Sequence, residues 1–153
     1  MLCHDVLSTL LDRYMMAWFS TGIGQAIMTS ANYSKLINGP VCLSFSYGLT
    51  SEAVQLAVKR SLAGGQLSTV GTWFYNDQPN YPQLSSVTVT VEVEFDQIYF
   101  VAEKPLYTMQ EEMVFIDDVL VTTGSCKGGG AGNLSAVWRC FIVCGFNNSC
   151  TLY

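Results

Sequence analysis

The chain has 153 residues, of which 50% are hydrophobic and only 12% charged, and its net charge is −5. This composition excludes a disordered chain, and the length suits one domain with a sizeable core. The seven Lys and Arg residues are scattered, so we expect no basic face and no nucleic-acid partner. A single histidine, His4, argues against histidine-dependent catalysis and multi-histidine metal sites.

The N-terminal segment is the one stretch with apolar residues near helical spacing, and it predicts a helix within residues 2–19. Residues 14–34 carry no charge, but their polar side chains dilute the segment well below a lipid-facing helix. The first residues also lack the basic start and apolar centre of a signal peptide. For a secreted protein we therefore expect the natural start upstream of Met1, or a chain that is a fragment.

After Gly24 the pattern changes to short β-like runs separated by turn residues. Residues 87–95 alternate strictly between apolar and polar, which predicts a strand with one buried face, and residues 103–112 are expected to form a loop. The predicted strands are residues 41–47, 54–62, 67–75, 87–95, 97–102 and 113–121. Without helices between them, these strands predict mainly antiparallel sheets in a sandwich, a jelly roll or a barrel.

Six cysteines and three N-glycosylation acceptors favour an oxidising, extracellular setting, although their pairing stays open and a cytosolic protein with reduced cysteines is the alternative. The acceptors are Asn32, Asn133 and Asn147. A glycine-rich linker begins at Lys127. The cysteine-rich tail that follows it is too short to form a core alone.

Three segments in the right order resemble the MAM domain, an extracellular module of meprins, neuropilins and receptor phosphatases. They are residues 42–47 (CLSFSY), 95–100 (FDQIYF) and 115–126, which begins FIDDV and ends in GSC. The most specific matches are the ordered residues Cys42, Gln97, Asp117, Asp118 and Cys126. The resemblance covers residues 18–126 and implies an extracellular, antiparallel two-sheet sandwich of jelly-roll type.

The resemblance divides the chain into three parts. Residues 1–13 do not match the family's opening segment, residues 14–126 form the MAM-like β-sandwich, and residues 127–153 are the linker and tail. The family's first cysteine pair is absent, so we interpret the chain as a divergent or N-terminally truncated member.

The same resemblance implies a disulfide between Cys42 and Cys126, which on the chain-entropy model stabilises the fold by about 4–5 kcal/mol. Alternation along a strand sends Asp117 and Asp118 to opposite faces, so one of them should approach the core or an adjoining loop. A buried carboxylate needs hydrogen bonds or a cation. Asp117 and Asp118 are therefore structural carboxylates or, as in some MAM domains, ligands of a structural Ca²⁺. Neighbouring strand positions do not face one cleft, which argues against paired-carboxylate hydrolysis.

What the resemblance implies about function is non-catalytic protein–protein recognition or adhesion, as one part of a larger cell-surface or secreted protein. The partner is another protein or a second copy, and membrane attachment comes only through a parent protein's span outside this chain. We expect the contact surface at an aromatic loop that contains Trp73, Tyr75 and Tyr81. The alternatives are a carbohydrate-binding jelly roll, in which these aromatics and Phe74 stack on sugar rings, and a fragment without independent function.

Overall fold

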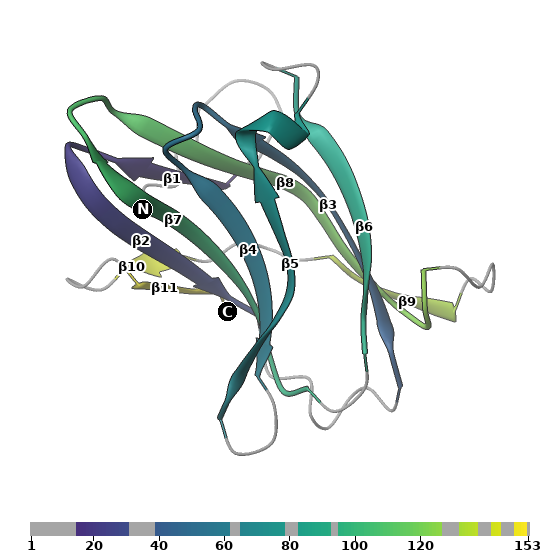
Figure 1. The fold of residues 1–153 in the computed structure, drawn as a ribbon. Coiled ribbons are helices and arrows are strands. Elements are labelled where there is room, and N and C mark those ends of the chain that lie inside the picture. Colours follow the sequence, from purple (N-terminus) through teal and green to yellow (C-terminus); the bar gives the residue numbers. More distant parts are fainter. Residues whose placement is uncertain are drawn as a thin grey trace.

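The computed structural model describes residues 15–30, 39–61, 65–78, 83–92 and 95–126, and the backbone of three further strands within residues 132–152. Two β-sheets pack face to face (Figure 1). The first sheet has the order β1-β8-β3-β6, formed by Met15–Phe19, Glu112–Thr123, Val41–Leu49 and Ser85–Val91. The second sheet contains the order β2-β7-β4-β5, formed by Gly22–Thr29, Ile98–Thr108, Gln55–Ser61 and Leu67–Phe74.

The order of these eight strands is that of a jelly roll. From β1 to β8 the chain crosses to the other sheet at every connection except the β4–β5 hairpin. All pairings among the eight strands are antiparallel. Two sheets connected in this way form the double Greek key of jelly-roll proteins. The predicted fold class, an all-β antiparallel two-sheet sandwich of jelly-roll type, is confirmed.

The core lies between the two sheets and follows from strand alternation. On β3 the apolar residues Val41, Leu43, Phe45, Tyr47 and Leu49 are buried in the core, while Cys42 and Ser44 face outward. On β6 the predicted apolar face of Val87, Val89 and Val91 packs against this core. Across the sandwich, the rings of Phe45 and Phe100 meet edge to face with centroids 5.1 Å apart.

The expected N-terminal helix is wrong for the described residues 15–19, which form β1. Met15, Ala17 and Phe19 are buried, whereas Trp18 faces outward, which is the period of a strand. β1 pairs with β8 along its whole length. Backbone pairing with β8 therefore overrides a local spacing that is compatible with a helix. Residues 1–14 lie outside the described residues.

The loop expected at residues 103–112 is also wrong. β7 continues to Thr108 and β8 begins at Glu112, so only three residues connect the two strands. The polar sequence suggested a loop because the segment contains charged residues. Two of them, Lys104 and Glu112, are buried in strands with hydrogen-bonding partners.

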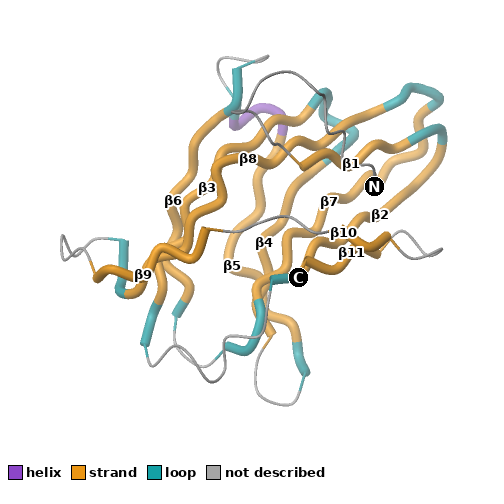
Figure 2. Tube along the Cα trace, turned by 180° about the vertical axis from the view of Figure 1, so that it is seen from behind, coloured by secondary structure: helices purple, strands orange, loops and turns teal. Residues whose placement is uncertain are grey.

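The C-terminal segment adds strands to both sheets (Figure 2). β9 (Gly132–Val137) pairs with β8, and β11 (Ser149–Leu152) pairs in parallel with β2. β10 (Ile142–Cys144) pairs with β11. The segment expected to be a linker and tail thus contributes backbone pairing to the sandwich.

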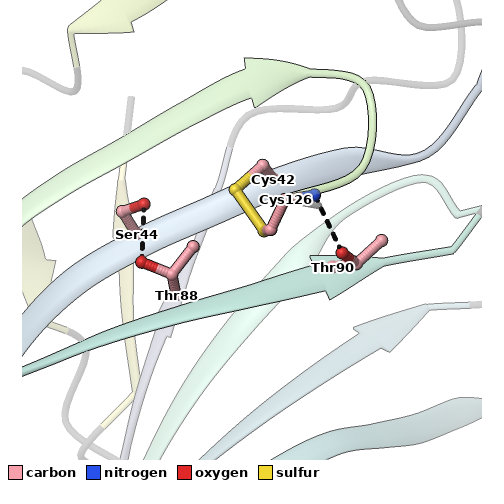
Figure 3. The surroundings of a disulfide bond; sticks show 5 residues. All are labelled: Cys42, Ser44, Thr88, Thr90 and Cys126. Atoms are coloured by element: carbon pink, nitrogen blue, oxygen red, sulfur yellow. Dashed lines mark hydrogen bonds between the residues drawn. A yellow bond between two sulfur atoms is a disulfide. The ribbon is translucent and has the colours of Figure 1, made fainter. Parts of the chain in front are cut away.

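A disulfide joins Cys42 of β3 to Cys126, just after β8, with their Cα atoms 4.8 Å apart (Figure 3). The amide of Cys126 also donates a hydrogen bond to Thr90 Oγ1 of β6, at 3.1 Å. Three elements of the first sheet are therefore fastened at one end. The pairing that the family resemblance implied is confirmed.

Candidate functional site

The outer surface of the second sheet carries a row of polar side chains, which we call the polar face: Gln25, Glu103, Gln55, Lys59 and Tyr99. Strand register makes them neighbours, since Gln25 and Gln55 both stand opposite Glu103 from the strands on either side. On the neighbouring strand β5, Phe74 stands opposite Gln55 and is 51% exposed, so it continues the line Gln25–Glu103–Gln55. Adjacent strands lie about 4.8 Å apart, so these groups are within reach of one another.

The carboxylate of Glu103 organises the polar face. Its two oxygens accept hydrogen bonds from Gln25 Nε2 at 2.8 Å and from Gln55 Nε2 at 2.6 Å. The ammonium of Lys59 lies 3.8 Å from one of the same oxygens. Within the described part of the chain, the amide oxygens of Gln25 and Gln55 have no partner. The face thus holds planar polar groups in fixed positions and leaves acceptors available to a ligand.

Apolar residues form the floor beside this row. Val101 and Ala57 lie on the outward side of their strands, yet both are buried, and they stand opposite each other in the register. Tyr99 follows, opposite Lys59, and its hydroxyl donates to Gln97 Oε1 at 3.0 Å. Gln97 Nε2 in turn donates to the Ser30 carbonyl at 3.1 Å. Gln97 thus has a structural hydrogen-bonding role, and it holds the Tyr99 hydroxyl in place.

The aromatic residues predicted to contact a partner lie elsewhere than expected. Trp73 is a residue of β5 rather than of a surface loop, and its ring packs edge to face on Phe45 with centroids 5.1 Å apart. Tyr75, in the 3-10 turn Tyr75–Asp77, also packs against the core. Alternation turns Trp73 inward and Phe74 outward, which explains the difference. Tyr81 lies outside the described residues.

Below these rings, Tyr47 of β3 is fully buried, with its ring centroid 6.2 Å from that of Trp73. Burial raises the pKa of the Tyr47 hydroxyl, and the negative charge of Asp77 raises it further. Both effects favour the neutral form of the buried Tyr47 hydroxyl.

Asp117 and Asp118 lie at a β-bulge in β8. Asp118 and Val119 both stand opposite one residue of β3, and Asp118 has a φ of 52°. Buried residues are even-numbered before the bulge, as at Ile116, and odd-numbered after it, as at Val121. Neither acid lies in the core, because the extra residue leaves Asp118 exposed and Asp117 half-buried. The alternative, that one of them approaches an adjoining loop, stays a prediction.

The Asp117 carboxylate contacts the backbone of Asp118, and the Asp118 carboxylate contacts β3. Asp118 N–H donates to Asp117 Oδ1 at 2.8 Å, and Ser46 Oγ donates to Asp118 Oδ2 at 3.4 Å. Among the described residues, no group of three or more His, Cys, Asp or Glu side chains is arranged to hold a metal. The Ca²⁺ site expected at Asp117 and Asp118 stays a prediction.

The three predicted glycosylation sites are not described at side-chain level. Asn133 belongs to the backbone of β9, whereas Asn32 and Asn147 lie outside the described residues. Their occupancy stays a prediction.

The outer surface of the first sheet near β1 is apolar, in contrast to the polar face. Trp18 pairs with Met113, and Met16 with Phe115. Leu84 reaches over Gly48, where an added Cβ would come within 2.8 Å of its Cδ2 atom. We call this set of residues the apolar face: Met16, Trp18, Leu84, Met113 and Phe115. Trp18 and Leu84 are its most exposed members.

Comparisons with known proteins add little to this geometry. No protein-family model matches the chain, and no curated protein matches it. One similar solved structure is described as "CBM4 structure and function"; it is 12% identical, with a TM-score of 0.49, over 72% of this chain and 84% of that chain. In the described residues, no helix is both long and apolar enough to span a membrane. The strand order places the protein in the class of jelly-roll β-sandwiches.

Proposed function

We propose that this chain is a non-catalytic module that binds carbohydrate on the polar face. The observation that carries the proposal is the row Gln25–Glu103–Gln55, held by hydrogen bonds beside the exposed ring of Phe74. Sugar hydroxyls both donate and accept hydrogen bonds, and planar amide and carboxylate groups meet them with fixed geometry. Aromatic rings offer an apolar surface to the C–H faces of a sugar ring.

Preorganisation supports the same proposal. Because Glu103 already holds both amides and attracts Lys59, a ligand does not have to order these side chains on binding. The buried Val101 and Ala57 close the space beneath the row. Recognition by such a face needs no reacting group, which fits a binding module.

The test is a glycan array followed by calorimetric titration of the sugars that bind. We expect Phe74→Ala and Gln55→Ala each to weaken binding by about tenfold or more, the cost of one stacked ring or one hydrogen-bonding partner. The matched control is Leu67→Ala, which truncates an exposed apolar side chain at the other end of the same strand. Absence of binding to every glycan, or full affinity in Phe74→Ala, would contradict the proposal.

Protein recognition, as in MAM domains, is the second candidate function, and the apolar face favours it. Trp18 and Leu84 leave apolar surface exposed on this face of the sandwich. For this candidate we expect the chain to self-associate in analytical ultracentrifugation and Trp18→Ser to return it to the monomer. A chain that stays monomeric at high concentration would contradict self-association through the apolar face.

We also propose an extracellular location, supported by the Cys42–Cys126 disulfide. A non-reducing peptide map of secreted protein, with and without glycan removal, would test this together with glycans at Asn32, Asn133 and Asn147. Free thiols at Cys42 and Cys126 in folded protein would contradict it.

A further inference from the structure

One end of the sandwich exposes several large apolar side chains, which we call the apolar tip. Its members and their exposed fractions are Ile23 (73%), Leu106 (60%), Tyr107 (66%) and Met109 (79%). They come from two connections, the β1–β2 turn with the start of β2, and the end of β7 with the β7–β8 turn. These two connections lie side by side at the same end (Figures 1 and 2). Exposure this high makes the tip a candidate for contact with an apolar medium.

A register irregularity between β2 and β7 brings the members of the tip together. Gly22 pairs with Thr108 and Gly24 with Lys104, so Ile23 alone stands opposite the three residues 105–107. Two of these extra residues of β7 are Leu106 and Tyr107, and both side chains are largely exposed to solvent. Tyr107 also lies across Gly22, its Cε2 atom 3.9 Å from where a Cβ would be.

A buried lysine holds the two connections in place. Lys104 is 0% exposed, and its Nζ donates to the carbonyl oxygens of Ser20, at 2.8 Å, and Gln110, at 2.7 Å. Ser20 belongs to the β1–β2 turn and Gln110 to the β7–β8 turn. The apolar tip is therefore fixed before it meets any partner, which lowers the entropy cost of binding.

The charges around the tip restrict the partner. The exposed charged residues described at this end are Glu52, Asp77 and Glu111, all acidic. An anionic membrane would be repelled by them, because membranes of that kind bind surfaces rich in Lys and Arg. The cationic outer groups of zwitterionic headgroups carry the complementary charge.

The size and shape of the tip separate a bilayer from a protein partner. Four side chains offer on the order of a few hundred Å², less than the roughly 800 Å² that each partner buries in a stable protein pair. Shallow insertion into the boundary between headgroups and acyl chains needs only a small apolar wedge, and Tyr is enriched at that depth. We propose that the apolar tip inserts into the surface of a zwitterionic lipid bilayer.

Co-sedimentation of the full chain with phosphatidylcholine vesicles tests this proposal. We expect binding that is insensitive to NaCl and falls by about tenfold or more in the double variant Leu106→Ser/Met109→Ser. Leu67→Ser is the control, because Leu67 is 47% exposed at the opposite end of the sandwich. Glu111→Lys should add binding to vesicles that contain phosphatidylserine. Thermal unfolding confirms that each variant is folded.

Three results would overturn the proposal. They are no sedimentation of the wild-type chain with phosphatidylcholine vesicles, unchanged binding by the double variant, and tighter binding of the wild type to phosphatidylserine vesicles. A dimer that the double variant abolishes would identify a second copy as the occupant of the tip instead. Phe74→Ala should retain vesicle binding, so failure of the carbohydrate proposal leaves this test intact.

Discussion

The outer faces of the two sheets enclose the same core but differ in what they present. The second sheet shows a continuous row of amides and a carboxylate, joined across β2, β7 and β4. The first sheet is apolar near β1, whereas small hydroxyl groups pair between its strands β3 and β6, Ser44 with Thr88 and Ser46 with Ser86. A regular register where β2, β7 and β4 meet thus aligns one kind of side chain over three strands, whereas the bulge of β8 changes which of its residues face outward.

The largest expected effect concerns the end of the first sheet that the disulfide fastens. The Cys42–Cys126 bond joins residues 84 positions apart. The double variant Cys42→Ser/Cys126→Ser should lower the free energy of unfolding by about 4 kcal/mol, because the unfolded chain regains the entropy of an open loop. Urea unfolding of the oxidised and variant proteins measures it. Equal midpoints would show that the bond contributes nothing to this sheet.

The bulge of β8 is the next test, since it changes which residues of this strand face outward. Asp118→Val should destabilise the protein by about 1–2 kcal/mol, because a β-branched residue is strained at positive φ. Asp118→Gly should stay within about 0.5 kcal/mol of the wild type, since glycine adopts this conformation freely. If thermal unfolding shows equal stability for both variants, Asp118 does not hold the left-handed conformation.

On the second sheet the expected effect is on binding rather than on stability. Glu103→Ala removes the acceptor of both amides, so we expect carbohydrate affinity to fall by about tenfold or more while stability changes by less than about 1 kcal/mol. Calorimetric titration and urea unfolding of the same variant separate the two effects. A large loss of stability with unchanged affinity would show that the polar face is structural.

The smallest effect concerns the core that both sheets share. Burial and the nearby Asp77 raise the pKa of Tyr47 above its ordinary value of about 10. Its contribution to stability is therefore fully present below about pH 10 and is lost as pH rises through the raised value. Tyr47→Phe should flatten the alkaline decline in melting temperature relative to the wild type. An identical decline in both proteins would show that Tyr47 stays protonated or that other groups dominate.

Sequence reasoning identified most strands, because alternation and turn residues are local signals. Residues 41–47 and 87–91 are strands as predicted, and the family resemblance pointed to the Cys42–Cys126 pair. It did not predict β1, because the apolar spacing there also suits a helix. It did not predict that β7 extends to Thr108 either, because a charged residue such as Lys104 is typical of a loop. In both cases the deciding contacts are with β8 or with a turn remote in sequence.

The polar face could not have been found from sequence, and the reason is register. Glu103 lies 78 positions from Gln25 and 48 positions from Gln55, so no local pattern predicts that they are neighbours. The sequence predicts an aromatic contact surface around Trp73, but the alternation of β5 makes Phe74 the exposed ring. A one-residue change of phase sends a side chain to the other side of a sheet, and local sequence specifies that phase weakly.

By itself, the sequence determined the fold class, since alternating strands without intervening helices leave only a β-sandwich or barrel to bury the apolar faces. It also determined which residues have the chemistry to bind a ligand. Only the tertiary structure decided which of them lie together and that Lys104 joins two turns. It also decided that the bulge at Asp118 shifts the alternation of buried residues along β8 by one position. Those outcomes depend on pairing between strands far apart in the chain, whose free energy no local pattern contains.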